Sequence, residues 1–397
     1  MRRLHIADTG QIRSGEVTDV YFMRTEEVLR ARGASRRVCM EVALKSWPDP
    51  RYLWGVFAGL EEVCVLLEGR RVTVRAMPEG SVFFTNEPVM TVEGDYLAFG
   101  ELETAILGCL CQASGIATQA SRCRVASRGR GLISFGARRM HPAIAPMVER
   151  AAFIGGCDGV ATVAAARLIG EQPMGTMPHA LVLQMGDTVK AALAFCDVVQ
   201  ESIPRVVLID TFQDEKFEAL RVAEALGDRL HGVRLDTPSS RRGNFRTILE
   251  EVRWELDLRG HSKVRLYVSG GLGLEDLLDL SDVVDAFGVG TRISSAATLD
   301  FSLDVVEVDG VALAKRGKNS GAKDVLRCTR CTRHMVVPRG TRVRCGCGGE
   351  TEDMLVTVME DGVLRAELPP ARKIRERSIR EVDLLRGARG EREFLGL

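Results

Sequence analysis

The 397-residue sequence lacks an excess of charge of either sign. Lysine and arginine together number 54, and so do aspartate and glutamate, which gives a formal net charge of zero. Proteins that bind nucleic acid or anionic membranes through their overall charge carry a basic excess. The balance therefore argues against such a partner for the whole molecule.

Long apolar runs are missing as well. No stretch approaches the roughly 18 uninterrupted apolar residues that suit a membrane-spanning helix, and no apolar run follows the basic start MRRLHIADTG. We therefore expect neither a membrane span nor an export signal. Without an export signal, the odd total of 11 cysteines is expected to be reduced, as in a cytoplasmic protein.

The composition is otherwise that of an ordinary globular protein, with 45% hydrophobic and 27% charged residues. The chain is long enough for two or three domains. Changes in its pattern predict an N-terminal α/β domain at residues 1–120, a β/α barrel at 121–310 and a C-terminal region at 311–397. We expect segments of the C-terminal region to complete the first domain.

Between residues 130 and 295, strand-like and helical runs alternate. The predicted strands are GLISFG (131–136), MGTMPH (174–179), RVVLID (205–210), GVRLD (232–236), VRLYVSGG (264–271) and DAFGVG (285–290). The predicted helices cover 158–170, 187–199, 214–226, 244–258 and 274–280. This alternation is typical of a parallel sheet. An open doubly wound sheet shares it, but candidate active residues at the ends of successive strands favour a β/α barrel.

Three further elements are predicted outside this region. A long helical pattern starts near Glu101 and is expected to cross between domains. Residues 355–367 are predicted as a hairpin with Asp361-Gly362 at its turn, because this dipeptide suits a tight turn between strands. Pro369-Pro370 then precedes a charged terminal helix near 372–386.

Glycines end the last two predicted strands of the barrel. Gly270 and Gly271 close the first of these strands, and Gly288 and Gly290 lie at the end of the second. In β/α barrels a phosphate commonly sits between these two loops, where a side chain would keep the backbone from approaching it. Tight turns also use glycine for steric reasons, but two such loops favour a phosphate site.

Charged residues mark the ends of two more strands. Asp210 ends RVVLID and Asp236 ends GVRLD, with Arg234 two residues before Asp236 on the same strand face. A carboxylate in this position suits ribose hydroxyls or a divalent cation. Each aspartate also fits the N-cap of the following helix, so both interpretations stay open here.

Arg138 and Arg139 follow Phe135 at the end of the first predicted barrel strand. Guanidinium groups suit pyrophosphate because they offer fixed pairs of donors, although adjacent arginines are often a solvated surface pair. His179 ends MGTMPH, and the chain has only 6 histidines. A histidine at the mouth of a barrel suits a phosphate contact or a phosphoryl acceptor, although a lone histidine is often structural.

Four cysteines crowd into one short segment. Cys328 and Cys331 are separated by thirteen residues from Cys345 and Cys347. Four thiolates at this spacing predict a tetrahedral structural Zn²⁺ site, which leaves no open position for a substrate. The second pair is spaced C-x-C rather than C-x-x-C, so His334 is an alternative ligand.

The segment from Lys315 to Arg344 is strongly basic. Next to a zinc ribbon it suggests contact with nucleic acid. It lacks interleaved aromatic residues, however, and the rest of the chain is not basic. We therefore interpret it as a solvated or phosphate-facing surface, not a nucleic-acid interface.

Taken together, the motifs resemble those of one family. SGIAT at 114–118 is similar to the signature shared by nicotinate and quinolinate phosphoribosyltransferases. Motifs similar to the nicotinate branch are SFGARR (134–139), GGCDGVATV (155–163) and GTMPHA (175–180). The match continues in the same order with RLDTPS (234–239), VSGG (268–271), FGVGTR (287–292) and AKRGKNSGAK (314–323). The resemblance covers roughly residues 10–325.

The resemblance implies an α/β protein with an N-terminal α/β domain, an irregular β/α barrel and a small zinc-ribbon-like module, assembled as a homodimer. It implies that Tyr21, reaching across from the second subunit, and Phe135 sandwich a pyridine ring. Arg138 and His179 would face pyrophosphate or phosphate.

The resemblance also assigns roles to the remaining strand ends. Arg234 and Asp236 would hold the base-proximal phosphate and the ribose, and Asp210 the ribose hydroxyls or Mg²⁺. The glycines that would surround the 5′-phosphate are Gly270, Gly271 and Gly290. The implied reaction joins nicotinate to phosphoribosyl pyrophosphate in NAD salvage, with ATP coupled through a phosphohistidine at His179.

Three alternatives to this function remain. Quinolinate phosphoribosyltransferase shares SGIAT, but a dicarboxylate substrate would want a denser set of basic residues. Nicotinamide differs from nicotinate only by an amide, which a single polar group can recognise. A protein of another class, a zinc-ribbon scaffold or nucleic-acid-binding protein on an inactive barrel, is disfavoured by the intact Arg138, His179, Asp210 and Asp236.

Overall fold

The computed structural model describes residues 4–387 and 389–397. Residues 1–3, on which the export-signal expectation partly rests, lie outside these ranges. The chain divides into two compact units, one made of residues up to Thr118 together with Ala297–Leu397, and the other of Gln119–Ala296. Every helix in the described ranges is too short or not apolar enough to cross a membrane.

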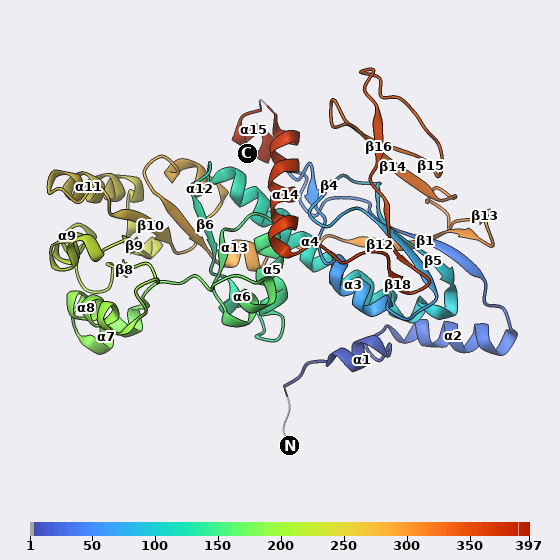
Figure 1. Ribbon diagram of the computed structural model, residues 1–397, viewed down its shortest axis with the longest axis horizontal. Coiled ribbons are helices and arrows are strands. Elements are labelled where there is room, and N and C mark those ends of the chain that lie inside the picture. Colours follow the sequence, from blue (N-terminus) through green and yellow to red (C-terminus); the bar gives the residue numbers. More distant parts are fainter. Residues whose placement is uncertain (1–3, 388) are drawn as a thin grey trace. The chain divides into compact units, whose positions relative to one another are not determined.

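A seven-stranded antiparallel sheet forms the centre of the first unit (Figure 1). Its strands, in order across the sheet, are β13 (Val311–Ala312), β12 (Phe301–Val308), β1 (Arg37–Leu44), β5 (Pro88–Asp95), β3 (Val72–Ala76), β17 (Val356–Glu360) and β18 (Val363–Leu364). Val72, Val74 and Ala76 alternate with less buried residues along β3, so one face of the sheet enters the core. Helix α3 (Leu60–Leu67) contributes Leu67 to the same core.

Strand β12 belongs to the first unit, although the predicted domain boundary places it in the barrel. The pattern predicts that the barrel extends to residue 310, whereas β12 pairs antiparallel with β1, with Val42 opposite Leu303. The reason lies in the run FSLDVVEV, in which Phe301, Leu303 and Val306 are buried. This run extends the antiparallel sheet rather than a β/α repeat.

The predicted long helix is present as α4 (Glu103–Ala126), and the chain passes from the first unit to the second within it. The predicted hairpin is also confirmed: it joins β17 to β18, and Asp361 and Gly362 have φ of 47° and 76°. Positive φ at both turn residues is typical of a type I′ turn, which explains the Asp-Gly dipeptide. The other elements of this unit are α1 (Thr9–Arg13), α2 (Val20–Arg32), β2 (Gly55–Val56), β4 (Val82–Phe83), η1 (Tyr96–Ala98), η2 (Gly100–Leu102), α14 (Ala371–Arg386) and α15 (Glu391–Leu395).

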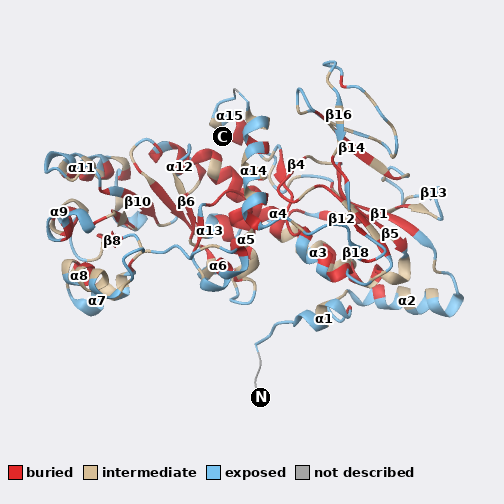
Figure 2. Ribbon diagram, viewed as in Figure 1, coloured by how far each residue is buried: buried red, intermediate tan, exposed pale blue. Residues whose placement is uncertain are grey.

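A curled, six-stranded parallel sheet forms the second unit, which confirms the predicted β/α class. Its strands, in order, are β7 (Gly159–Val160), β6 (Gly131–Ser134), β11 (Ala286–Val289), β10 (Arg265–Ser269), β9 (Gly232–Leu235) and β8 (Val206–Leu208). The helices are α5 (Ala145–Ile154), α6 (Val163–Ile169), α7 (His179–Met185), α8 (Thr188–Val198), α9 (Glu215–Leu226), α10 (Ser239–Arg242), α11 (Phe245–Leu258), α12 (Leu274–Leu280) and α13 (Thr291–Ser294), with η3 (Ala137–Arg139) and η4 (Gly227–Arg229). Figure 2 shows the strands as mostly buried and the helices as buried only in part.

One predicted barrel strand is wrong. MGTMPH (174–179) forms no strand, and His179 instead begins α7. Pro173 and Pro178 have no N–H group to donate to a neighbouring strand, so the segment cannot form a regular ladder. The sixth strand of the sheet is instead β7, two residues that lie within the helix predicted at 158–170.

The C-terminal region of the chain contains a small three-stranded antiparallel sheet. Its strands, in order, are β15 (His334–Pro338), β14 (Lys323–Cys328) and β16 (Thr351–Asp353). Arg75 joins this sheet to β3, since its guanidinium donates to Asp324 at 2.8 Å and to Asp353 at 2.9 Å. The module is therefore fastened to the first unit by ion pairs that are partly shielded from solvent.

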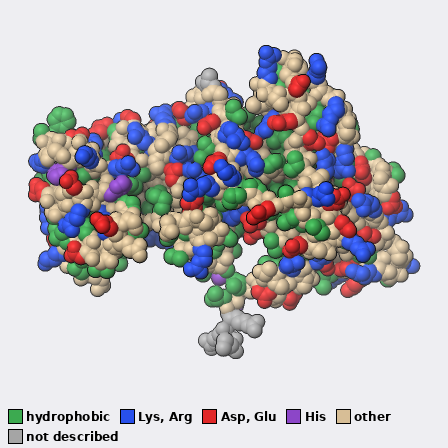
Figure 3. Space-filling view, viewed as in Figure 1, with side chains coloured by type: hydrophobic (Ala, Val, Ile, Leu, Met, Phe, Trp, Pro, Cys, Tyr) green, Lys and Arg blue, Asp and Glu red, His purple; other side chains and the backbone are tan. Residues whose placement is uncertain are grey.

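Several basic residues of this region are paired with carboxylates. Lys323 lies 2.8 Å from Glu41, and Lys315 and Lys318 both lie 2.6 Å from Asp304. On the face seen in Figure 3, basic side chains along β14–β16 are interspersed with acidic ones. These pairings offset part of the positive charge of the run from Lys315 to Arg344.

Candidate active site

Four side chains predicted to be functional come together at one edge of the parallel sheet. Asp210 follows β8, Arg234 lies on β9 and Asp236 follows the same strand. Because the strands are parallel, their carboxyl ends meet at this edge. His179 joins them as the first residue of α7.

The His179 imidazole is held between carboxylates and a hydroxyl. Its Nε2 lies 3.8 Å from Oδ2 of Asp210 and 3.7 Å from Oδ2 of Asp236. On the other side of the ring, Nδ1 lies 3.1 Å from Oγ1 of Thr211. The side chain is nevertheless 42% exposed. The ring is thus oriented by its neighbours and still accessible to a bound molecule.

Arg234 is fixed by two acceptors and an aromatic face. Its Nη1 donates to Oγ of Ser269 at 3.2 Å, and its Nη2 donates to the backbone oxygen of Met177 at 3.3 Å. The guanidinium carbon lies 5.9 Å from the centre of the Phe135 ring. Burial lowers the pKa of the Arg234 guanidinium, and the positive charge of Arg138 acts in the same direction.

Asp210 is the most enclosed of the acidic groups. Its side chain is 3% exposed, and Oδ1 has no hydrogen-bond partner among the described residues. Burial raises the pKa of Asp210, an effect that the nearby His179 opposes. A buried carboxylate oxygen without a partner is suited to accept a hydrogen bond from a hydroxyl group of a ligand or to bind a cation.

The loop after β10 turns sharply at the predicted glycine pair. Gly270 and Gly271 have φ of 94° and 71°, a conformation that other residues rarely adopt. A Cβ at Gly271 would meet no atom within 4 Å, so open space borders the loop there. A Cβ at Gly270 would lie 3.0 Å from Oδ1 of Asp236. Glycine at 270 thus leaves room for the Asp236 carboxylate.

Gly288 lies within β11 and Gly290 directly follows the strand, and both lie close to Phe135. A Cβ at Gly288 would lie 2.4 Å from two ring carbons of Phe135. A Cβ at Gly290 would lie 3.4 Å from the backbone oxygen of Phe135. Gly288 therefore gives the aromatic ring its place beside the sheet edge.

The remaining predicted site residues are less closely tied to this cluster. Arg138 and Arg139 lie on η3 and are exposed, and of the two the charge of Arg138 is felt at Arg234. Tyr21 belongs to the other unit, where it is exposed on α2. Its role across a subunit boundary stays a prediction.

Three residues that sequence reasoning missed take part in the network. Ser269 bonds both Arg234 and Asp236, and Thr211 bonds His179. Arg242 donates to the backbone oxygens of Thr237 and Gly270, which joins the loops after β9 and β10. Thr211 follows Asp210 and Ser269 precedes Gly270, each at a strand end. This position next to a predicted site residue is the sequence feature that could have identified them.

The four clustered cysteines form a second candidate site, in the first unit. Their sulfur atoms all lie within 4.8 Å of one another. Cys328 is 3.5 Å from Cys347, and Cys331 is 3.5 Å from Cys345. Backbone N–H groups of Cys331 and Arg330 point at the Cys328 sulfur and lower the pKa of that thiol to about 6. A thiolate there is the form that a metal binds.

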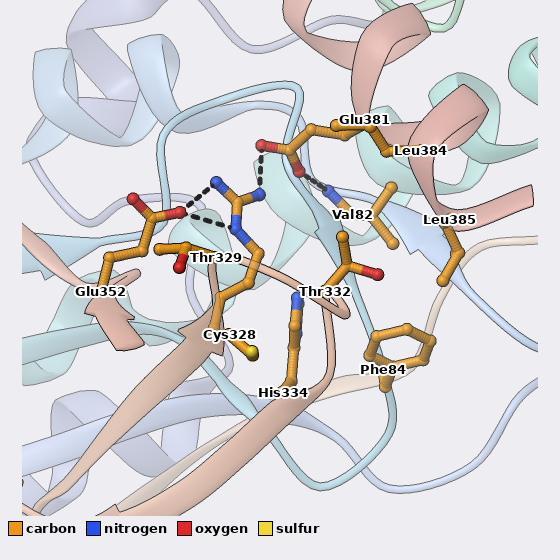
Figure 4. A pocket seen from close by; sticks show the side chains of 11 residues that line it. Val82, Phe84, Cys328, Thr329, Thr332, His334, Glu352, Glu381, Leu384 and Leu385 are labelled. Atoms are coloured by element: carbon orange, nitrogen blue, oxygen red, sulfur yellow. Dashed lines mark hydrogen bonds and ion pairs between the residues drawn. The ribbon is translucent and has the colours of Figure 1, made fainter. Parts of the chain in front are cut away.

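His334 does not belong to the cysteine cluster. Its Nδ1 lies 3.0 Å from a carboxylate oxygen of Glu87, and its side chain is 5% exposed. It borders a cavity of about 260 Å³ together with Phe84, Arg327 and Glu381 (Figure 4). Arg327 bonds Glu381 of α14 there, at 2.7 Å. His334 and Arg327 therefore fasten the β14–β16 module to its surroundings.

Two family models match the chain. The model of the quinolinate phosphoribosyl transferase N-terminal domain matches residues 19–114, and that of the C-terminal domain matches residues 116–304. Nicotinate phosphoribosyltransferase pncB2 of Mycobacterium tuberculosis is 30% identical over 353 residues, which cover 85% of this chain and 74% of that protein. Nicotinate phosphoribosyltransferase of Bacillus subtilis is 31% identical over 227 residues, or 56% of this chain and 45% of that protein.

Solved structures give similar results. Nicotinate-nucleotide pyrophosphorylase from Pyrococcus furiosus is 52% identical, with a TM-score of 0.94 over 97% of this chain and 99% of that chain. Human nicotinic acid phosphoribosyltransferase has a TM-score of 0.74 at 20% identity, over 95% of each chain. At that identity the human structure shows a shared fold.

Proposed function

The chain belongs to the nicotinate phosphoribosyltransferase family of pyridine phosphoribosyltransferases, and we propose that it joins nicotinate to phosphoribosyl pyrophosphate. The products are nicotinate mononucleotide and pyrophosphate. The observation that carries the proposal is the gathering of His179, Asp210, Arg234 and Asp236 at one edge of the parallel sheet.

In the proposed reaction the pyridine nitrogen forms a bond to C1 of the ribose while the bond from C1 to the pyrophosphate oxygen breaks. The transition state is oxocarbenium-like, so the protein needs no nucleophile for this step. Its task is to align base and ribose and to stabilise the negative charge that develops on the leaving group.

Each residue of the cluster suits one part of this task. Phe135 offers a face for the pyridine ring, and Arg234, whose guanidinium carbon lies 5.9 Å from the centre of the Phe135 ring, suits the base-proximal phosphate and the ribose. Asp236 suits the ribose hydroxyls, and Arg138 and Arg139 suit the pyrophosphate. The loops at Gly270, Gly271 and Gly290 suit the 5′-phosphate, whereas Gly288 leaves room for the Phe135 ring. Tyr21 would complete the base site from the second subunit of a homodimer.

We further propose that Mg²⁺ accompanies the pyrophosphate. The donor set fits, because Asp210 presents a buried carboxylate oxygen without a partner among the described residues, and Asp236 adds a second carboxylate nearby. Bound there, Mg²⁺ would neutralise charge on the leaving group.

ATP coupling through His179 is proposed for the same site. Thr211 contacts Nδ1 at 3.1 Å, and Nε2 lies 3.8 Å from Asp210 and 3.7 Å from Asp236, beyond hydrogen-bond distance, in a side chain that is 42% exposed. A histidine held in this way suits a phosphoryl acceptor, which would form an N–P bond at Nε2 as the bond to ADP breaks.

The cysteine cluster is proposed to bind structural Zn²⁺. Tetrahedral ligands at about 2.3 Å from zinc lie about 3.8 Å from one another. The four sulfurs already lie within 4.8 Å of one another. The site has four protein ligands and no open position, so a role in stability rather than in the reaction follows.

The test is pyrophosphate release from phosphoribosyl pyrophosphate and Mg²⁺ with nicotinate, nicotinamide or quinolinate, each with and without ATP. Release that depends on nicotinate supports the proposal, and a dependence on ATP supports the role of His179. Preference for quinolinate or nicotinamide would replace the substrate. No release with any base, combined with salt-sensitive binding to RNA or DNA, would favour an inactive scaffold.

A further inference from the structure

Ser269 stands between two residues of the candidate active site. It is the last residue of β10, adjacent in the sheet to β9, and only 2% of it is exposed. Its Oγ donates to Oδ1 of Asp236 at 2.7 Å and accepts from Nη1 of Arg234 at 3.2 Å. A single hydroxyl thus bonds both the carboxylate and the guanidinium.

The bonding capacity of a hydroxyl fits this arrangement. A serine hydroxyl has one proton to donate and lone pairs to accept. Asp236 can only accept and Arg234 can only donate, so the directions of both bonds are fixed. If Asp236 and Arg234 exchanged places, neither hydrogen bond to the hydroxyl could form. The hydroxyl therefore defines where each of the two groups lies.

The bond to Asp236 also sets which oxygen faces the site. Oδ1 is held by Ser269, and Oδ2 lies 3.7 Å from Nε2 of His179. The tight turn at Gly270 leaves room for Oδ1, because a Cβ there would lie only 3.0 Å away. The carboxylate plane is therefore fixed by Ser269 on one side and is open toward His179 on the other.

We propose that Ser269 is a positioning residue that holds Asp236 and Arg234 in register with each other for phosphoribosyl transfer. Ser269 is buried behind the two groups and acts through them. This inference rests on the proposed function, since the effect of holding the two groups in place is measured through the rate of phosphoribosyl transfer. Loss of an outer hydrogen-bond partner typically lowers affinity or activity by about 10- to 100-fold.

The test compares Ser269→Ala, Ser269→Thr and Ser134→Ala with the wild type. Ser134 is the matched control, because it ends β6, is fully buried and has an Oγ without a hydrogen-bond partner among the described residues. Three quantities are measured: kcat, KM for phosphoribosyl pyrophosphate, and binding of phosphoribosyl pyrophosphate with Mg²⁺ by calorimetry. Thermal melting of each variant reports folding.

We expect Ser269→Ala to lower kcat/KM by about 10- to 100-fold, mostly in kcat, because misplaced groups act on charge that develops as the bond breaks. Binding of phosphoribosyl pyrophosphate should weaken about threefold or more. Ser269→Thr keeps the hydroxyl and should recover most of the activity. Ser134→Ala should stay within about twofold of the wild type in every quantity, since no hydrogen bond is lost.

Two outcomes would overturn the inference while the wild type is active. One is a Ser269→Ala enzyme that retains kcat/KM and binding within about twofold of wild type. The other is a Ser269→Thr enzyme that melts normally but is as slow as Ser269→Ala. If the wild type binds phosphoribosyl pyrophosphate but turns over no base, the proposed function fails, and the binding comparison still decides the role of Ser269. If the wild type neither binds phosphoribosyl pyrophosphate nor turns over a base, both the proposed function and the inference about Ser269 are wrong.

Discussion

Nε2 of His179 lies 3.7 Å from Oδ2 of Asp236, although 57 positions separate the two residues in the chain. The pair brings together an imidazole at the start of a helix and a carboxylate at the end of a strand. A ligand bound beside this pair can contact both side chains, so the same place suits both proposed activities, the phosphoryl transfer from ATP and the phosphoribosyl transfer. Substitutions at the two positions should therefore have different effects.

Replacing His179 with Asn should abolish ATP coupling, because the side chain then has no ring nitrogen to accept a phosphoryl group. Wild-type protein incubated with γ-labelled ATP should acquire an acid-labile label, and the variant should not. Pyrophosphate release by the variant should be the same with and without ATP. A label that persists in the variant would assign the phosphoryl acceptor elsewhere.

Replacing Asp236 with Asn should lower kcat/KM by about 100-fold or more, because a neutral amide no longer stabilises positive charge on the ribose or a cation. The amide is similar in size, and the melting temperature should change little. Steady-state kinetics and thermal melting of the same preparation check both statements. An unchanged rate would remove Asp236 from the site.

Replacing Gly288 with Ala should displace Phe135, since the new Cβ would lie 2.4 Å from two ring carbons. We expect KM for nicotinate to rise about tenfold and stability to fall by about 1–3 kcal/mol from overpacking. The matched control is Gly108→Ala on α4, where a Cβ would meet nothing within 4 Å. The control should leave KM unchanged and stabilise the helix slightly. A Gly288→Ala enzyme with normal KM would show that Phe135 does not contact the base.

The cluster that these variants probe was partly visible in the sequence. Apolar strands alternating with helices predicted that Asp210, Arg234 and Asp236 follow one another around a sheet edge, and the structure brings them together. The role of Ser269 was not predictable in this way. Its hydrogen bonds depend on which strands are neighbours and on their register, with Val268 of β10 beside Leu235 of β9. Both are set by tertiary packing.

His334 illustrates the same limit. Its spacing from Cys331 was compatible with a zinc ligand, but its imidazole bonds Glu87, which is 247 positions away in the chain. Likewise, MGTMPH has the apolar residues of a strand, but Pro173 before it and Pro178 within it have no N–H group to donate to a strand ladder. Local patterns predict an element or a ligand type, whereas partners distant in sequence decide what the side chain does.

Stability should depend on pH through Glu103 of α4. Burial raises the pKa of Glu103 to about 7, and the negative charge of Asp304 adds to the effect. Because the folded pKa lies above the unfolded one, the stabilisation is fully present below the unfolded pKa and is lost as pH rises through about 7. Replacing Glu103 with Gln should therefore raise the free energy of unfolding at pH 8 by on the order of 1 kcal/mol, since solvent screens part of the effect, and change it little near pH 4.

Asp304 gives a control of opposite sign. Burial alone would raise its pKa, but hydrogen bonds from Lys315 and Lys318 lower the pKa of Asp304 to about 2. Its contribution is present above the unfolded pKa and is lost as pH falls through about 2, so Asp304→Asn should destabilise the protein at pH 8. Urea unfolding at both pH values measures the two variants. Equal shifts for Glu103→Gln at pH 4 and pH 8 would contradict the assignment.

Replacing Cys328 and Cys331 together with Ser should lower stability and leave the reaction intact. Metal analysis should find one Zn²⁺ per wild-type chain and none in the double variant, because serine hydroxyls do not replace thiolates as zinc ligands. The β14–β16 module should then unfold at a lower temperature, and a chelator should have the same effect on the wild type. The kcat and KM values should stay near those of the wild type, since a closed four-ligand site offers no position to a substrate. A double variant that melts like the wild type, or a wild type that is equally stable without zinc, would show that the four thiols come together for another reason.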